Sequence, residues 1–106
     1  MGIELRIRAE GGHWPPETVS PETFLERLPG RACFSEVPVV VHASGAGALE
    51  LRRASANVHA MPAVSVHIEE RGFYVLDNDR TVANLVVAEL VRYLTGSFER
   101  VTIEEP

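Results

Sequence analysis

Strict alternation of apolar and polar residues in three segments constrains the fold of this chain more than any other feature of its sequence. The apolar sets are Ile3/Leu5/Ile7, Leu49/Leu51 and Val64/Val66/Ile68, and the polar sets between them are Glu4/Arg6/Arg8, Glu50/Arg52 and Ser65/His67/Glu69. A period of two residues predicts β-strands. One face of such a sheet packs on a core while the other meets water.

Three further strands are predicted from composition and turn signals. Residues 37–43 form the most hydrophobic run, with Pro38 near its start, and residues 44–47 form a turn toward the strand at 49–52. Arg71-Gly72 is expected to turn the strand at 64–69 into a strand at 73–76. The last strand is expected over residues 98–103, with Val101 and Ile103 facing inward.

Two helices are predicted. Ser20 is a good N-cap ahead of Pro21, and Pro29-Gly30 stops this helix after about two turns. Asp79 or Thr81 caps a longer helix over residues 80–95, which Gly96 ends. Its apolar face at helical spacing is Ala83, Val86, Val87, Leu90, Val91 and Leu94.

These elements predict an α+β fold with the order β-α-β-β-β-β-α-β. Two helices cannot cover both faces of six strands, so the expected architecture is a two-layer sandwich. It has a mostly antiparallel sheet with both helices on one face. Residues 1–106 suit a single globular domain. These patterns do not determine the order of the strands in the sheet.

Composition excludes several kinds of chemistry. All ten basic residues are arginine, and fifteen acids give a net charge of -5. Without lysine there is no Schiff-base nucleophile and no P-loop lysine. A GC-rich, bacterial-like genome explains the absence of lysine best. The acidic balance argues against nucleic acid and against an anionic membrane surface as partners. The N-terminus does not resemble a secretory signal, so we expect a cytoplasmic protein.

No motif predicts a metal, a cofactor or a catalytic group. Cys33 is alone, and the four histidines (His13, His42, His59 and His67) share no ligand spacing. The segment 42–47 lacks the G-x-S-x-G pattern and precedes a strand, so it is not a nucleophile elbow. Asp77-Asn78-Asp79 is interpreted as a helix cap, although Asp77 could serve as an acid or base beside a distant histidine.

Two features suggest a binding surface. His13 and Trp14 lie in a Gly- and Pro-rich loop, where Trp14 could be an interface anchor or could fold back over the core. Arg6, Arg8, Arg52 and Arg100 alternate out of the sheet, and His67 and Glu69 share that face. Arginine forms bidentate carboxylate pairs that could stiffen this face or grip a partner.

Three function classes remain. The preferred one is a non-catalytic protein-binding module, of the size and charge of an immunity-type neutraliser of a basic protein. An alternative is a small enzyme or ligand-binding domain whose pocket lies between sheet and helices, with His42, His67, Tyr74 or Asp77 near its mouth. The third is a homodimeric structural subunit that pairs through the open sheet face or an edge strand.

Overall fold

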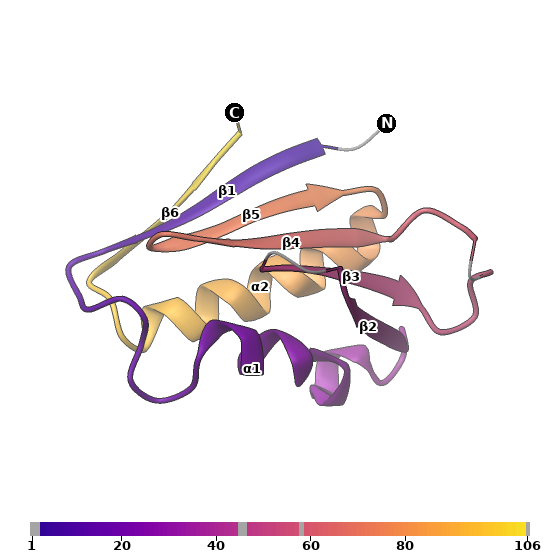
Figure 1. The fold of residues 1–106 in the computed structure, drawn as a ribbon, viewed down its shortest axis with the longest axis horizontal. Coiled ribbons are helices and arrows are strands. Elements are labelled where there is room, and N and C mark those ends of the chain that lie inside the picture. The colour runs from indigo at the N-terminus through magenta and orange to yellow at the C-terminus, as the bar shows by residue number, and fades with distance from the viewer. Residues whose placement is uncertain (1–2, 45–46, 58, 106) are drawn as a thin grey trace.

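The computed structural model describes residues 3–44, 47–57 and 59–105, and these form six strands and two α-helices (Figure 1). The strands are β1 (Ile3–Glu10), β2 (Val39–Ala43), β3 (Ala48–Arg53), β4 (Val64–Glu69), β5 (Gly72–Asp77) and β6 (Arg100–Glu104). The helices are α1 (Pro21–Glu26) and α2 (Arg80–Thr95), and short 3₁₀ turns at Leu28–Gly30 and Ala32–Phe34 follow α1. The predicted α+β class and element order are confirmed.

All strand pairs of the single sheet are antiparallel, and the strand order is β2-β3-β4-β5-β1-β6. The first strand is therefore an interior strand, which pairs with β5 on one side and with β6 on the other. β2 and β6 form the two edges of the sheet. Both helices lie beneath one face of the sheet, as Figure 1 shows.

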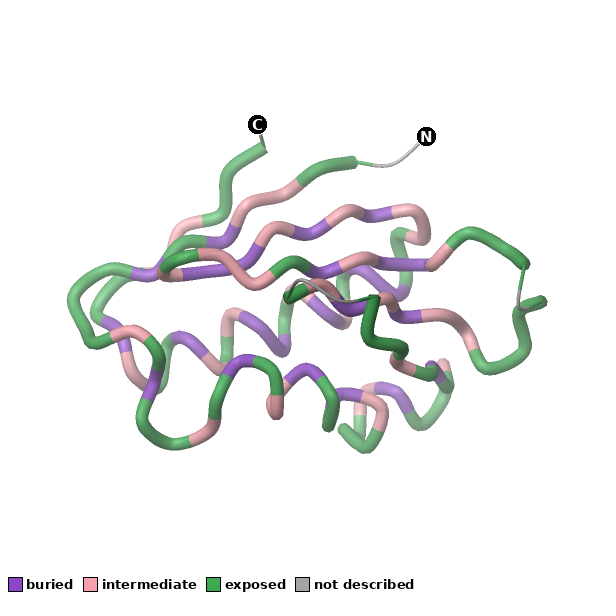
Figure 2. Tube along the Cα trace, viewed as in Figure 1, coloured by how far each residue is buried: buried purple, intermediate pink, exposed green. Residues whose placement is uncertain are grey.

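The core lies between the sheet and the helices, where buried residues of the strands and of both helices form one hydrophobic cluster. Figure 2 shows these buried residues recurring along the strands and the helices. Fully buried side chains come from the strands, such as Ile7, Leu51 and Val75, and from the helices, such as Leu25 and Leu90. No helix in the described part of the chain is long and apolar enough to cross a membrane.

Contacts between aromatic rings join the two helices. Phe24 of α1 stacks on Tyr93 of α2 with ring centroids 4.3 Å apart. The hydroxyl of Tyr93 donates a hydrogen bond to the backbone carbonyl of Val19, just ahead of α1. Burial, with a smaller contribution from Glu22, raises the pKa of Tyr93 to about 12. This residue fixes α1 against α2 and thereby keeps both helices in one layer.

The structure shifts several predicted boundaries. β2 begins at Val39 rather than residue 37, and α1 ends at Glu26, so Pro29 and Gly30 lie in the 3₁₀ turn that follows it. The β4–β5 turn consists of Glu70 and Arg71, and Gly72 is already the first residue of β5. Arg71 takes the left-handed backbone conformation, with a φ of 67°. β6 begins at Arg100 rather than residue 98, because the amide of Phe98 still bonds the Leu94 carbonyl at the end of α2. Gly45 and Ala46 of the turn predicted after β2 lie outside the described residues.

The cap predicted for the long helix is confirmed at Asp79. Its side chain accepts a hydrogen bond from the amide of Val82, at 3.5 Å. Its two carboxylate oxygens also accept from Arg53 of β3, at 2.6 and 3.2 Å. Hydrogen bonding to Arg53 holds the pKa of Asp79 below its ordinary value. Asp79 therefore both begins α2 and ties it to the sheet.

We expect Asp79→Asn to lower the free energy of unfolding only where the carboxylate of the wild type is charged. Asparagine caps a helix about as well as aspartate, so the change removes mainly the charged pair with Arg53. Because the folded pKa is depressed, this stabilisation is complete above the unfolded pKa and is lost as pH falls through the folded pKa. Urea titrations measure the difference in the free energy of unfolding between Asp79→Asn and the wild type. This difference should be constant above about pH 5 and should shrink below about pH 4. A difference that grows toward low pH would contradict the assignment.

Candidate functional site

The face of the sheet opposite the helices, here called the outer face, carries the polar residues of the alternating strands. Strand register aligns His67 of β4, Tyr74 of β5 and Arg6 of β1 in one row across its centre. The Tyr74 ring packs edge-on against His67, with centroids 5.8 Å apart. The Arg6 guanidinium lies 5.6 Å from the centroid of the same ring, within the range of a cation–π contact.

Glu69 completes this group, since Nε of Arg6 donates to its carboxylate at 3.0 Å. We call Arg6, His67, Glu69 and Tyr74 the charged–aromatic cluster. The pKa of Tyr74 lies above its ordinary value, first because the Glu4 carboxylate favours the protonated phenol and second because of burial. The Tyr74 hydroxyl therefore remains a neutral hydrogen-bond donor at neutral pH. Each member is held by another, so the cluster presents a fixed pattern of groups.

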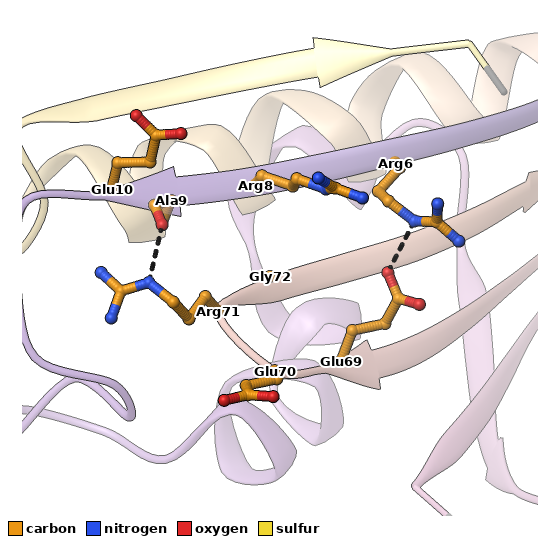
Figure 3. A pocket seen from close by; sticks show the side chains of 8 residues that line it. All are labelled: Arg6, Arg8, Ala9, Glu10, Glu69, Glu70, Arg71 and Gly72. Carbon is orange, nitrogen blue, oxygen red and sulfur yellow. Dashed lines mark hydrogen bonds and ion pairs between the residues drawn. The ribbon is translucent and has the colours of Figure 1, made fainter.

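A depression of about 490 Å³ lies next to the cluster. Its lining residues are Arg6, Arg8, Ala9, Glu10, Glu69, Glu70, Arg71 and Gly72 (Figure 3). Gly72 stands opposite Arg8 on β1 and opposite Glu69 on β4. These three residues form a second row across the sheet, and the middle position of this row has no side chain. The missing side chain leaves room between the neighbouring charged groups.

The three arginines of the depression differ in what they contact. Arg6 is engaged by Glu69, as above. Arg71 donates to the backbone carbonyls of Ala9 and Gly12, at 3.2 and 3.0 Å. Among the residues that the structure describes, no carboxylate lies within ion-pair distance of Arg8. Figure 3 shows the Arg8 side chain extended along β1 toward Arg6. Arg8 is therefore the guanidinium that remains available to a ligand.

Of the eight residues predicted for a binding surface, the structure brings together Arg6, Arg8, His67 and Glu69. Arg100 lies on edge strand β6, where its guanidinium is 3.7 Å from the Glu10 carboxylate. Arg52 shares the outer face but lies on β3, where it bonds the Glu50 carboxylate at 3.2 Å and the Ala60 carbonyl. His13 is exposed in the loop after β1. Trp14 is half-buried on the helix side, with its ring 6.0 Å from those of Phe73 and Phe98. The tryptophan loop and the outer face are thus separate surfaces.

The residues considered for a pocket between sheet and helices are also dispersed. His67 and Tyr74 lie on the outer face, and His42 is exposed on edge strand β2. Asp77 is buried at the end of β5, where Nε of Arg80 contacts its carboxylate at 2.9 Å. Within residues 3–44, 47–57 and 59–105, no three His, Cys, Asp or Glu side chains are close enough to hold a metal ion.

One polar group in the helix layer was missed by the sequence reasoning. Glu89 of α2 is 5% exposed. Its carboxylate accepts from Nε of Arg31 at 2.9 Å and contacts the Cys33 thiol at 3.6 Å. Burial, followed by the nearby Glu89 charge, raises the pKa of Cys33, which keeps the thiol protonated. The spacing of Glu89 from Val82 and Val86 was the available signal, because it places Glu89 on the apolar face of the helix.

Comparisons of the chain with protein families, with characterised proteins and with solved structures find no significant match. The geometry of the outer face is therefore the basis on which a function can be assigned.

Proposed function

We propose that the protein is a non-catalytic binding module that holds a basic protein partner on the outer face of its sheet. The observation that carries this proposal is the charged–aromatic cluster beside Arg8 and the depression over Gly72. Tyr74 and Arg6 are of the residue types that dominate the binding energy of protein interfaces. Their positions are already fixed by Glu69 and His67, so little side-chain freedom is lost on binding.

The net charge of the protein favours a basic partner at long range, and the charged groups of the outer face favour a partner surface that carries both signs of charge. The net charge of -5 attracts a positively charged protein and speeds its encounter. At close range, Arg8 would donate two hydrogen bonds to a carboxylate of the partner in a bidentate pair. The exposed Glu70 and Glu10 on the rim of the depression would accept its basic side chains. A partner must match both signs, which gives the face selectivity.

Site-specific photocrosslinking in the native host tests this proposal. A photoreactive amino acid replaces His67, which is exposed on the outer face, and Asn84, which is exposed on α2, in the control protein. We expect a defined heterologous adduct from position 67 and not from position 84, with a basic protein identified by mass spectrometry. No adduct from position 67, or equal adducts from both positions, would overturn the proposal. An adduct only with a second copy of the chain would assign the face to self-association instead.

The identified partner then allows a kinetic test of the role of charge. Association should slow as salt rises, with a smaller change in dissociation, because screening acts on the encounter of opposite charges. Arg8→Glu should weaken the complex about tenfold or more by placing like charges together. Arg27→Glu is the matched control, since Arg27 is exposed at the end of α1, on the opposite side of the sheet. Equal effects of the two changes would contradict a docking site at Arg8.

A further inference from the structure

The free edge of β6 is the second surface of interest. β6 is an edge strand of the sheet, and among the described residues it pairs on one side only, with β1. Figure 1 shows β6 leaving the end of α2 and running along β1 toward the C-terminus. An edge strand with free backbone groups can pair with a strand of another chain.

The register shows which backbone groups of β6 lie on this edge. The amide of Ala9 in β1 bonds the Arg71 carbonyl on the β5 side. Hydrogen-bonding direction alternates along a strand, so Arg8 and its even-numbered neighbours bond toward β6. Thr102, which is opposite Arg8, consequently bonds toward β1. The amides and carbonyls of Val101 and Ile103 then point away from the sheet.

The sequence of β6 is complementary to itself. It reads Arg100-Val101-Thr102-Ile103-Glu104. Consider two copies of β6 that pair antiparallel about Thr102. Arg100 of each copy then lies opposite Glu104 of the other. The same register also places Val101 opposite Ile103 twice and pairs the two Thr102 residues. Opposite charges, β-branched residues and Thr–Thr are all favourable cross-strand pairs.

Neighbouring registers lose this complementarity. If the pair is centred on Val101, Arg100 faces Thr102 of the other copy. If it is centred on Ile103, Glu104 faces Thr102. Only the pair centred on Thr102 joins both charged ends of the strand to opposite charges. In that register the outward-pointing groups of Val101 and Ile103 also face each other and form about four hydrogen bonds.

The two faces of β6 fit the same arrangement. Ile103 lies opposite Ile7 on the helix side of the sheet, as predicted. It is nevertheless 51% exposed. A second copy in this register covers Ile103 with its own Val101. Arg100, Thr102 and Glu104 share the outer face with Glu10, Arg8 and Arg6, their partners in β1. Both copies therefore keep their helices on the same side.

The other edge strand lacks these features. β2 reads Val39-Val40-Val41-His42-Ala43 and contains no pair of opposite charges. Pro38 precedes it directly and cannot donate a backbone hydrogen bond. Val40 is 42% exposed there, close to the exposure of Ile103, and so offers a matched control position.

We propose that β6 pairs with β6 of a second copy of this chain, antiparallel about Thr102, to form a symmetric dimer with one continuous sheet. The self-complementary charges of Arg100 and Glu104 carry this inference, and the free edge and the exposed Ile103 support it. The dimer would use the free edge of β6, which borders the outer face where Glu104 and Thr102 lie opposite Arg6 and Arg8. Ile103, the residue changed to disrupt the dimer, lies on the helix side instead. Loss of the dimer and loss of a heterologous partner are therefore separate results.

Sedimentation velocity over about 10 μM to 1 mM protein measures the dimer, because a small interface gives modest affinity. We expect a concentration-dependent dimer for the wild type, a monomer for Ile103→Lys and an unchanged dimer for Val40→Lys. A wild type that stays monomeric throughout this range overturns the proposal. So does a dimer that survives Ile103→Lys. Circular dichroism of each variant confirms that the fold is retained.

Charge reversal tests the pairing of Arg100 with Glu104. Arg100→Glu alone should weaken the dimer about tenfold, since it places two carboxylates opposite each other at both ends of the pair. Adding Glu104→Arg to the same chain restores opposite charges and should restore dimerisation. Failure of the double variant to recover, with its fold intact, would contradict this register.

Cysteine crosslinking tests the centre of symmetry. In a Cys33→Ser background, Thr102→Cys places two thiols opposite each other at a non-hydrogen-bonded pair, with Cα atoms about 4.5 Å apart. This separation suits a disulfide, and a mild oxidant should crosslink the two copies. Arg100→Cys is the control, because its two copies would lie about 13 Å apart. Equal crosslinking of both variants would overturn the Thr102 centre.

Discussion

Gly72→Ala is expected to lower the free energy of unfolding by about 3 kcal/mol, in the upper part of the range for an overpacked interior. A Cβ added at Gly72 would lie 1.9 Å from the backbone carbonyl oxygen of Ile7 and 3.1 Å from Cα of Arg8. These atoms belong to β1 in the middle of the sheet, so β1 and β5 would have to separate. Urea unfolding followed by circular dichroism measures the change.

Gly30→Ala is the matched control for this effect. A Cβ at Gly30 meets no atom within 4 Å, and its φ lies outside the left-handed region. Alanine there should leave stability unchanged or raise it by about 0.5 kcal/mol through the unfolded state. If Gly72→Ala proved as stable as Gly30→Ala, the close approach of β5 to β1 would be refuted. The depression on the outer face, which depends on that position having no side chain, would be refuted with it.

Gly72 illustrates which parts of the fold local sequence patterns predict. Arg71-Gly72 gave a correct signal for a turn, but the reason for the glycine is contact with β1, more than sixty residues away in the chain. The left-handed position falls on Arg71 instead, where no glycine marks it. The guanidinium of Arg71 bonds the carbonyls of Ala9 and Gly12, and these contacts accompany the unusual backbone conformation.

The elements with strong periodicity were predicted well. Alternation identified β1, β3 and β4 and their outward residues, and the long helix begins and ends at the predicted residues 80 and 95. The insertion of β1 between β5 and β6 was beyond prediction, because all the alternating strands have similar polar and apolar faces. Pairing is decided by how the helices and loops pack, which no single strand encodes.

The sequence predicts which residues of the candidate site face outward, but it does not predict which of them lie next to one another. The outward positions of Arg6, His67 and Glu69 follow from the alternation, and Tyr74 faces outward between the buried Phe73 and Val75. Their gathering into one cluster depends on β5 lying between β4 and β1. Arg52 was expected on the same surface, and the same strand order places it two strands from Tyr74.

Trp14 shows the limit of reasoning from a loop sequence. Its Gly- and Pro-rich surroundings fit both an exposed anchor and a residue that covers the core. The contacts that distinguish the two come from Phe73 of β5 and Phe98 after α2, both distant in sequence. Arg71 lies over the ring of Phe98, with its guanidinium 5.8 Å from the ring centroid, and so joins the same group. The loop after β1 thereby closes one end of the core.

Trp14→Ala is therefore expected to lower the free energy of unfolding by about 2–3 kcal/mol, somewhat less than a fully buried tryptophan would cost. His13→Ala, at the exposed neighbouring position, should change stability by less than about 0.5 kcal/mol. Trp14→Phe should recover part of the loss, because a smaller ring can still contact Phe73 and Phe98. A stable Trp14→Ala protein that no longer bound its partner would instead make this loop part of the interface.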